Sequence, residues 1–463
     1  MIYLLMLAVF VLGYLLIALE HPLKIDKAAS ALIAGSLCWA IFALGLFEID
    51  IYATNFKKFL SYFQIKDIKY TAEYIAENMA YVKQKFVIYE LSHHLSEIGQ
   101  ILFFLLGAMT IVEVVDAHQG FSIITNRIKT TNRVKLMWIL CVLSFFFSAT
   151  LDNLTTAIVM SALLAKLIKD KEDLWLFAGM VIISANAGGA WSPIGDVTTI
   201  MLWIGGQVTA LNIIKTVFIP SVVCMVVPLI YLSLKLKGNI TRPSDAVAVG
   251  HQTNPTTLFE KKLIFNLGLF GLLFVPVFKT ITHLPPYVGI LFSLGIMWLV
   301  TELLHKNKQY EDKKYLTVIG VLKRIDVATI FFFLGILLAV ASLQSMGHLN
   351  DLAVILDDTF KGNIYAINII IGLLSAIVDN VPLVAGAMGM YEIGTGAFAV
   401  DGTFWDFLAY CAGTGGSVLI IGSAAGVAVM GILKIDFIWY MKKISLLAFL
   451  GYIAGAIAFI LMQ

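Results

Sequence analysis

Long apolar stretches constrain this 463-residue chain more than any other feature of its sequence. A helix needs about 20 apolar residues to cross a bilayer core of about 30 Å. Lipid offers no partner to unpaired backbone groups, so segments too long for barrel strands must cross it as helices. The apolar stretches cover residues 1–19, 28–47, 98–116, 136–168, 174–205, 211–234, 258–280, 286–303, 325–345, 364–391, 404–431 and 437–461. We therefore expect an all-α polytopic membrane protein.

The composition identifies the expected partner as the lipid bilayer. Hydrophobic residues make up 60% of the chain and charged residues 13%, whereas a soluble domain has about 45–50% and about 25%. The net charge is only +2, without the clustered Lys and Arg that a nucleic-acid-binding protein needs. We expect no nucleic-acid partner.

The two halves of the chain resemble each other. A polar segment of linker composition, 235–257, separates residues 1–234 from residues 258–463. Residues 148–153 resemble residues 375–380, and residues 184–189 resemble 411–416, both at an offset of 227 (148 to 375, 184 to 411). Residues 103–107 also resemble residues 331–335, at an offset of 228 (103 to 331), and the three blocks together indicate an internal repeat. The first half also contains an insertion, about 48–97, which we expect to be an amphipathic, surface-lying segment.

Loop charges predict the orientation of the two copies. If the segments that contain Asp152 and Asp379 are re-entrant hairpins, each half crosses the membrane five times, and the odd number inverts the second copy. Lys and Arg are concentrated in the loops at 117–135, 166–173, 235–257 and 304–324, so these loops and 20–27 are expected to be cytoplasmic. This predicts two inverted repeats, each with a re-entrant hairpin and an interrupted helix, and both termini outside.

Polar residues inside the apolar segments fall at repeat-related positions. The hairpin segments contain Ser148, Asp152, Asn153, Thr155, Asp379 and Asn380. A carboxylate at such depth costs a few kcal/mol or more, so it is kept by pairing, by protonation or by a cation that comes and goes. Capping of the broken helices by the Asp side chains is a structural alternative, and both roles can hold together.

A second polar cluster lies where the next helices are interrupted. Two glycines followed by Ser-Pro-x-Gly cannot continue as a regular helix. The first half has Asn186, Asp196, Thr198 and Thr199 here, and the second half has Ser417 and Ser423 but no carboxylate. We expect a cation nearer the first half, although capping alone explains Asp196 equally well.

The ligand types favour a hard cation. Carboxylate, amide, hydroxyl and freed carbonyl oxygens suit a cation such as Na⁺. The clusters contain no His or Cys, which argues against zinc, copper or haem, and we expect no cofactor. A buried carboxylate that holds either a proton or a cation is the simplest antiporter, and we expect Asp152 to be the carboxylate at which Na⁺ and H⁺ compete.

A separate group could sense pH. His94 faces Glu90 and Glu97 at helical spacing, and His93 is adjacent. Ordinary surface histidines at a solvated helix start are the alternative.

These motifs together resemble the NhaD-type sodium/proton antiporters of the ion transporter superfamily, which also contains arsenite permeases. The motifs are residues 90–98, 103–113, 148–156 and 184–199, and the last is the most specific. The resemblance implies a homodimer in the bacterial inner membrane, with a scaffold and an elevator-type transport domain in each protomer. It also implies exchange of cytoplasmic Na⁺ or Li⁺ for external H⁺. The implied ion path is lined by Asp152, Asn153, Asn186, Asp196, Thr198, Thr199, Asp379, Asn380, Ser417 and Ser423.

Two other functions compete with this interpretation. The first is an anion permease of the same superfamily, for arsenite or a carboxylate. Superfamily relatives that carry dicarboxylates have Ser-Asn-Thr at the hairpin tips, whereas here Asp precedes Asn, which disfavours an anionic substrate. The second is an intramembrane aspartyl protease, suggested by Gly195-Asp196, but Pro193 occupies the first glycine position of that motif. We expect a transporter and not an enzyme.

Overall fold

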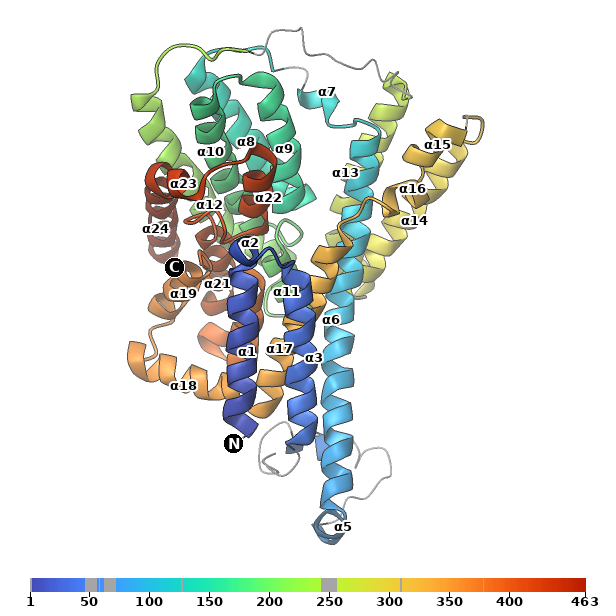
Figure 1. Ribbon diagram of the computed structural model, residues 1–463, viewed down its shortest axis with the longest axis vertical. Helices are drawn as coiled ribbons and strands as arrows, with labels where there is room; N and C mark the ends of the chain where they lie inside the picture. The colour runs from blue at the N-terminus through green and yellow to red at the C-terminus, as the bar shows by residue number, and fades with distance from the viewer. Residues whose placement is uncertain are drawn as a thin grey trace. The chain divides into compact units, whose positions relative to one another are not determined.

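The computed structural model describes residues 2–45, 56–57, 59–61, 72–125, 128–242, 256–308, 310–377 and 379–463 (Figure 1). Parts of the expected insertion and of the expected linker, including 62–71 and 243–255, lie outside the described residues. The described residues form helices, and their β-structure is one isolated bridge between Asn132 and Asn239. The expectation of an all-α protein is confirmed.

Nine helices within the described residues are long and apolar enough to cross a membrane. They are α3 (Lys27–Leu44), α6 (Met79–Ala117), α8 (Arg133–Leu151), α10 (Lys171–Ala190), α12 (Ala210–Lys235), α13 (Leu258–Thr282), α14 (Pro286–Leu304), α17 (Val327–Met346) and α24 (Ser445–Met462). The chain is therefore a multi-pass membrane protein.

Shorter helices complete the described structure. They are α1 (Ile2–Ala18), α2 (Glu20–Leu23), α5 (Ala72–Glu77), α7 (Ser122–Thr125), α9 (Asn153–Leu167), α11 (Val197–Ile204), α15 (Tyr310–Leu316), α16 (Val318–Leu322), α18 (His348–Phe360), α19 (Ile364–Leu374), α20 (Asn380–Met390), the 3₁₀ turn η3 (Gly396–Phe398), α21 (Thr403–Gly415), α22 (Ala424–Leu433) and α23 (Phe437–Lys443). Several of these are half-helices. The expected apolar segments 136–168, 174–205, 364–391 and 404–431 each divide into two helices, as α8 with α9, α10 with α11, α19 with α20, and α21 with α22.

The helices form two compact units. The first consists of Met1–Leu102, Asp326–Lys361 and Ala385–Glu392. Within it α3 packs on α17 so closely that a Cβ atom at Gly35 would lie 2.5 Å from the carbonyl oxygen of Gly335. Only glycine allows this approach of the two backbones.

The first unit also shows where the insertion lies. Phe56, Phe59 and Phe86 are at most 1% exposed and belong to one apolar cluster with Phe42 of α3 and Leu343 of α17. The expectation of a surface-lying segment is wrong for these parts of 48–97, because their aromatic side chains pack into a core. From Met79 onward the insertion is the beginning of α6.

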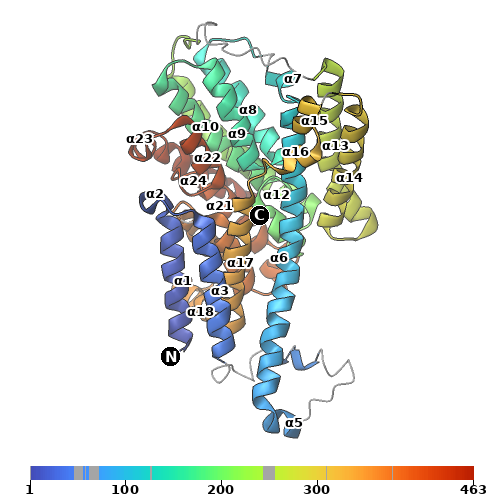
Figure 2. The same ribbon diagram turned by 45° about the vertical axis from the view of Figure 1, so that its right-hand side comes forward.

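The second unit consists of Phe103–Ile325, Gly362–Val384 and Ile393–Gln463. Within it α8, α9 and α10 pack together, and α13 packs on α14 (Figure 2). The loops predicted to share one side contact one another. The Lys169 amide donates to the Thr241 carbonyl (2.9 Å), and the Ile240 amide donates to the Thr131 carbonyl (2.8 Å). These contacts join 117–135, 166–173 and the start of 235–257.

The same close approaches recur 227 residues apart in the second unit. A Cβ atom at Gly188 would collide with the Phe145 carbonyl, and one at Gly415 would collide with the Gly372 carbonyl. Likewise Gly189 approaches Gly195 and Gly416 approaches Gly422. At this offset Asp196 corresponds to Ser423, and Asn186 corresponds to Gly413.

Candidate functional site

Asp152 forms the junction between α8 and α9. Its carboxylate accepts hydrogen bonds from the Thr155 amide (2.7 Å) and the Thr155 hydroxyl (2.8 Å), which caps α9. Its backbone has φ 81° and ψ 160°, a region that is essentially restricted to glycine and costs about 1–3 kcal/mol. The capping role expected for Asp152 is therefore present, and it is accompanied by backbone strain.

The second hairpin segment is built in a related way. The Val381 amide donates to the Asp379 carboxylate (3.2 Å) at the start of α20. Ser375 corresponds to Ser148, and its hydroxyl donates to the Gly372 carbonyl (2.7 Å). Both Asp residues thus lie at the beginning of a half-helix.

The break between α10 and α11 positions Asp196. Its carboxylate accepts the Thr198 amide (3.1 Å), and the Thr199 hydroxyl donates to the Asp196 carbonyl (2.9 Å). Ser423 does the same at the break between α21 and α22, where its hydroxyl accepts the Gly426 amide (3.1 Å). Helix capping is again present at both repeat-related positions.

Side chains from all four breaks meet in one hydrogen-bonded network. The Asn153 amide nitrogen donates to Asp196 Oδ2 (2.9 Å) and to Asn186 Oδ1 (3.1 Å). The Asn380 amide nitrogen lies 3.4 Å from the same Asp196 oxygen. The Asn186 amide nitrogen donates to the hydroxyls of Ser417 and Ser423, both at 2.9 Å. These six side chains, Asn153, Asn186, Asp196, Asn380, Ser417 and Ser423, are buried.

Other predicted site residues lie around this network. Asp152 and Asp379 are near enough to interact electrostatically with Asp196. Thr155 is bound to Asp152, and Thr198 and Thr199 follow Asp196 in α11. Ser148 is fully buried, and its hydroxyl has no hydrogen-bond partner among the described residues.

Thr156 is a polar residue of the first hairpin segment that is not among the residues predicted to line the ion path. Its side chain is fully buried in α9, and its hydroxyl likewise has no partner in the described part of the chain. It follows Asn153 by three residues, which places the two on one face of the helix. This spacing from Asn153 is the sequence feature that could have identified Thr156 as a site residue.

The network can bind a proton or a small hard cation. Its ligand atoms are carboxylate, amide and hydroxyl oxygens, which suit Na⁺ and Li⁺. The half-helices α9, α11, α20 and α22 all begin here, and helix N-termini favour negative charge. The chain's own carboxylates, Asp152, Asp196 and Asp379, occupy three of these four N-termini.

The expected pH-sensing group lies in the first unit. His94 Nε2 is 3.7 Å from Glu90 Oε2, and His94 Nδ1 is 3.6 Å from Glu97 Oε2. The Ser345 hydroxyl of α17 donates to Glu90 (2.8 Å) and lies 3.2 Å from His94 Nε2. The side chains of His94 and Glu90 are 9% and 7% exposed, whereas His93 and Glu97 are exposed. The alternative of surface histidines therefore holds for His93 but not for His94.

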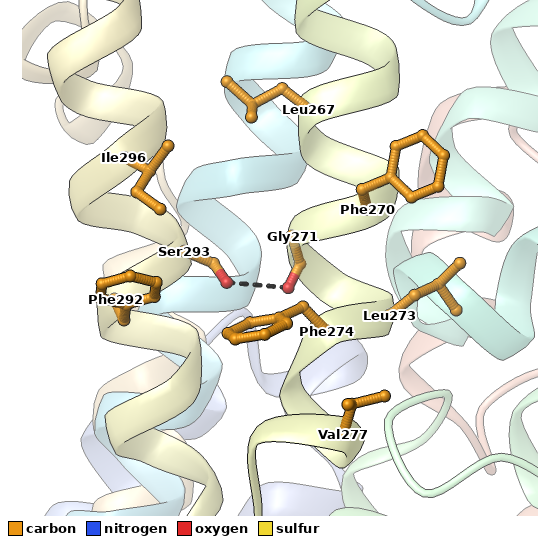
Figure 3. Close-up of a pocket in the computed structure, with 9 residues that line it drawn as sticks. All are labelled: Leu267, Phe270, Gly271, Leu273, Phe274, Val277, Phe292, Ser293 and Ile296. Carbon is orange, nitrogen blue, oxygen red and sulfur yellow. Dashed lines mark hydrogen bonds between the residues drawn. The ribbon is translucent and has the colours of Figure 1, made fainter.

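A cavity of about 460 Å³ between α13 and α14 offers no comparable ligands (Figure 3). It is lined by Leu267, Phe270, Gly271, Leu273, Phe274, Val277, Phe292, Ser293 and Ile296. The Ser293 hydroxyl donates to the Gly271 carbonyl (2.9 Å), so both polar groups are already satisfied. Such a lining suits lipid chains and not an ion.

Comparisons with known proteins agree with this chemistry. The model of the family described as citrate transporter (CitMHS) matches residues 14–405. Sodium/proton antiporter 2 of Arabidopsis thaliana is 41% identical over 458 residues, 97% of both chains. The Na⁺/H⁺ antiporter NhaD of Alkalimonas amylolytica is 30% identical over 476 residues, 97% of this chain and 88% of that protein.

A third relative is longer than this chain. Sodium/proton antiporter 1 of Arabidopsis thaliana is 49% identical over 375 residues, 81% of this chain and 63% of that protein. The match thus spans less than two thirds of the plant protein. The family and these relatives are transporters by description, and none of them is named as an enzyme. The chain belongs to the citrate transporter family and, within it, to the NhaD-type sodium/proton antiporters.

Proposed function

We propose that the chain exchanges cytoplasmic Na⁺ or Li⁺ for external H⁺ and that the cation and the proton compete for the carboxylate of Asp196. The observation that carries the proposal is the position of Asp196 Oδ2, which is contacted by Asn153 and Asn380, one from each hairpin segment. The names of the relatives support exchange of Na⁺ for H⁺.

The two asparagines can adapt to either bound ion. An ionised carboxylate only accepts hydrogen bonds, and the amide nitrogens of Asn153 and Asn380 face it as donors. Protonation adds one O–H donor, which the amide oxygen of Asn380 can accept after that amide turns over, while Asn153 keeps its bond to Asn186. The amide oxygens can also ligate Na⁺, together with the hydroxyls of Ser148 and Thr156, which have no hydrogen-bond partner among the described residues.

Asp152 supplies a second charge to this site. It belongs to the same half as Asp196 and interacts with it electrostatically. Repulsion between two nearby carboxylates favours binding of one positive ion between them. We therefore propose that the cation binds nearer the first half. Asp152 either ligates the cation directly or supplies a second negative charge near it.

Two inverted repeats and an elevator-type movement complete the proposal. The recurrence of glycine contacts at an offset of 227 and the grouping of basic loops support the repeats. The cysteines Cys38, Cys141, Cys224 and Cys411 are buried, so single surface cysteines can be labelled selectively. Lys169→Cys should react with an impermeant thiol reagent only from the cytoplasm and Lys361→Cys only from outside. The homodimer and the bacterial inner membrane remain predictions.

Carboxylate transport is the second candidate, and the description of the matching family favours it. Helix N-termini bind anionic substrates in transporters with broken helices. Here the side chains of Asp152, Asp196 and Asp379 already occupy N-termini at the candidate site. These carboxylates would repel a carboxylate substrate, so cation exchange is favoured over carboxylate transport.

Membrane vesicles with an imposed pH gradient separate the two candidates. We expect Na⁺ or Li⁺ to collapse the gradient in vesicles with wild-type protein, and K⁺ or citrate to leave it in place. Asp196→Asn should abolish the response, because the Asn side chain carries no charge. Asn still caps a helix, so the structural role of Asp196 is kept in this variant. Asp152→Ala should weaken exchange at least tenfold.

The control is Asp436→Asn, since Asp436 caps α23 outside the network. It should exchange like the wild type. Full exchange by Asp196→Asn, or gradient-driven citrate uptake by the wild type, would overturn the proposal.

A further inference from the structure

A second cavity, of about 610 Å³, lies in the second unit away from the polar network. It is lined by Asp116, Gln119, Phe121, Ser122, Ile128, Ile158, Val159, Ala162, Leu163, Lys166, Leu167, Arg242 and Lys261. Lys166 lies in the last turn of α9 and Lys261 in the first turn of α13. Asp116 is next to the end of α6. The cavity is therefore located where three helices end or begin.

Positive charge dominates this cavity. Three cationic side chains face one carboxylate, and Asp116 also interacts with Arg324 and Lys166. Lys261 Nζ donates to Gln119 Oε1 (2.9 Å), which holds it in place. One terminal nitrogen of Arg242 donates to the Ile128 and Thr130 carbonyls, both at 3.2 Å. A guanidinium has five N–H groups, so others remain for an anion.

Much of the remaining lining of the cavity is apolar. Ile158, Val159, Ala162 and Leu163 lie on α9, and Phe121 follows α6. A cavity that combines cations with an apolar wall at the ends of membrane helices matches an amphiphile with an anionic head. Basic pockets of this kind between membrane helices bind phospholipid head groups.

We propose that this cavity binds one anionic phospholipid, with its phosphodiester between Lys166, Arg242 and Lys261 and an acyl chain along α9. Arg and Lys are the residues that recognise phosphate oxygens. A free phosphate ion would contact the cationic side chains but not the apolar ones. A phospholipid contacts both, so it is the ligand that fits the whole cavity.

The bound lipid would restrain the helix that carries Asn153. α9 begins at Asn153 in the candidate site and ends near Lys166 in this cavity. A headgroup that bridges Lys166 and Lys261 ties α9 to α13. This effect on exchange rests on the proposed function, whereas lipid binding does not.

Lipid binding can be measured on the full-length protein without any transport assay. Delipidated protein in neutral detergent is titrated with phosphatidylglycerol, with phosphatidylcholine of the same chain lengths, and with inorganic phosphate. We expect phosphatidylglycerol alone to raise the unfolding temperature by several degrees, and native mass spectrometry to show one added lipid. The double variant Lys166→Gln/Lys261→Gln should lose at least tenfold in affinity.

Two controls test the position of the site. Lys169→Gln and Lys262→Gln remove neighbouring exposed lysines that do not line the cavity, and both should bind like the wild type. Lys166→Arg/Lys261→Arg keeps the charge and should retain binding even if the Gln variant folds poorly. Equal stabilisation by phosphatidylcholine or by inorganic phosphate would overturn the proposal. Undiminished binding by a folded Gln variant would do the same.

Discussion

Asp152 combines a charged side chain with a backbone conformation that suits glycine. Its φ of 81° is strained for any residue with a Cβ atom, and its carboxylate compensates by capping α9 through Thr155. A purely structural position would relieve the strain with glycine. The presence of Asp at this strained position is consistent with a role for its charge in the site.

Replacing Asp152 by Gly and by Ala separates these contributions. Both variants lose the cap, but Gly relieves the backbone, so Asp152→Gly should be about 1–2 kcal/mol more stable than Asp152→Ala. Both should exchange ions at least tenfold more slowly than the wild type. Thermal unfolding in detergent and vesicle assays measure the two properties. Equal stability of the variants would argue against strain, and normal exchange by Asp152→Gly would argue against a role for the charge.

His94 and His93 form a matched pair for the pH-sensing hypothesis. His94 is buried between Glu90, Glu97 and Ser345, whereas the side chain of His93 is 55% exposed. We predict that His94→Gln shifts the pH profile of exchange by at least half a unit, and that His93→Gln leaves it unchanged. The profile is measured in vesicles at fixed Na⁺. An unshifted His94→Gln profile would reduce this group to a structural contact.

At the scale of helices, close glycine contacts hold the broken helices together. α10 reaches α8 at Gly188, and α21 reaches α19 at Gly415, where any side chain would collide with a backbone carbonyl. Gly188→Ala and Gly415→Ala should each lower the free energy of unfolding by about 1–3 kcal/mol or more, because backbone must move. A Cβ atom at Gly295 in α14 would meet no other atom of the described residues within 4 Å beyond its own helical backbone and chain neighbours, so Gly295→Ala should be neutral or stabilising by about 0.5–1 kcal/mol. Similar unfolding temperatures for all three variants would contradict the packing described here.

A buried histidine pair joins the ends of two helices. His118 follows α6, His305 follows α14, and their Nε2 atoms are 2.7 Å apart with both side chains fully buried. One nitrogen must donate and the other accept, so the pair is disrupted when both carry protons. Burial lowers the pKa of His305 to about 4, and the nearby His118 and Lys308 contribute to the shift. Burial also lowers the pKa of His118.

These shifts set the sign of a pH effect on stability. The folded state binds fewer protons than the unfolded state once the pH falls below the ordinary histidine value of about 6.5. The contribution of this histidine pair to stability is therefore fully present above that pH and is lost as the pH falls toward 4. His305→Gln should show a smaller loss between pH 7 and pH 4.5 in thermal unfolding, while His93→Gln should follow the wild type. Identical curves for His305→Gln and the wild type would exclude the pair as the cause.

At the scale of the whole molecule, sequence repeats predicted where helices break but not what the breaks bring together. Ser192, Pro193 and Gly195 follow the end of α10, so the interruption itself was predictable. The prediction that Gly188 and Gly189 already interrupt the helix was wrong, because α10 continues through both of them to Ala190. The bond from Asn186 to Ser417 joins residues 231 positions apart, and local patterns carry no information about that distance. For this reason Asp196, at the centre of the network, could not be ranked above Asp152.

The predicted surface position of the insertion, about 48–97, was wrong for a different reason. Its many charges indicated a surface segment, but Phe56, Phe59 and Phe86 pack with α3 and α17 in the first unit. Aromatic residues interleaved with Lys and Glu are typical of an amphipathic segment. Which face of such a segment is covered depends on tertiary contacts.

The central claim, competition of Na⁺ and H⁺ for one carboxylate, is tested most directly by the apparent KM for Na⁺ as a function of pH in proteoliposomes. If both ions bind the Asp196 carboxylate, KM should rise about tenfold for each pH unit below its pKa, while the maximal rate at saturating Na⁺ stays constant. The Asp196→Asn variant should show no exchange at any pH. A KM for Na⁺ that does not change with pH, with exchange intact, would contradict the account.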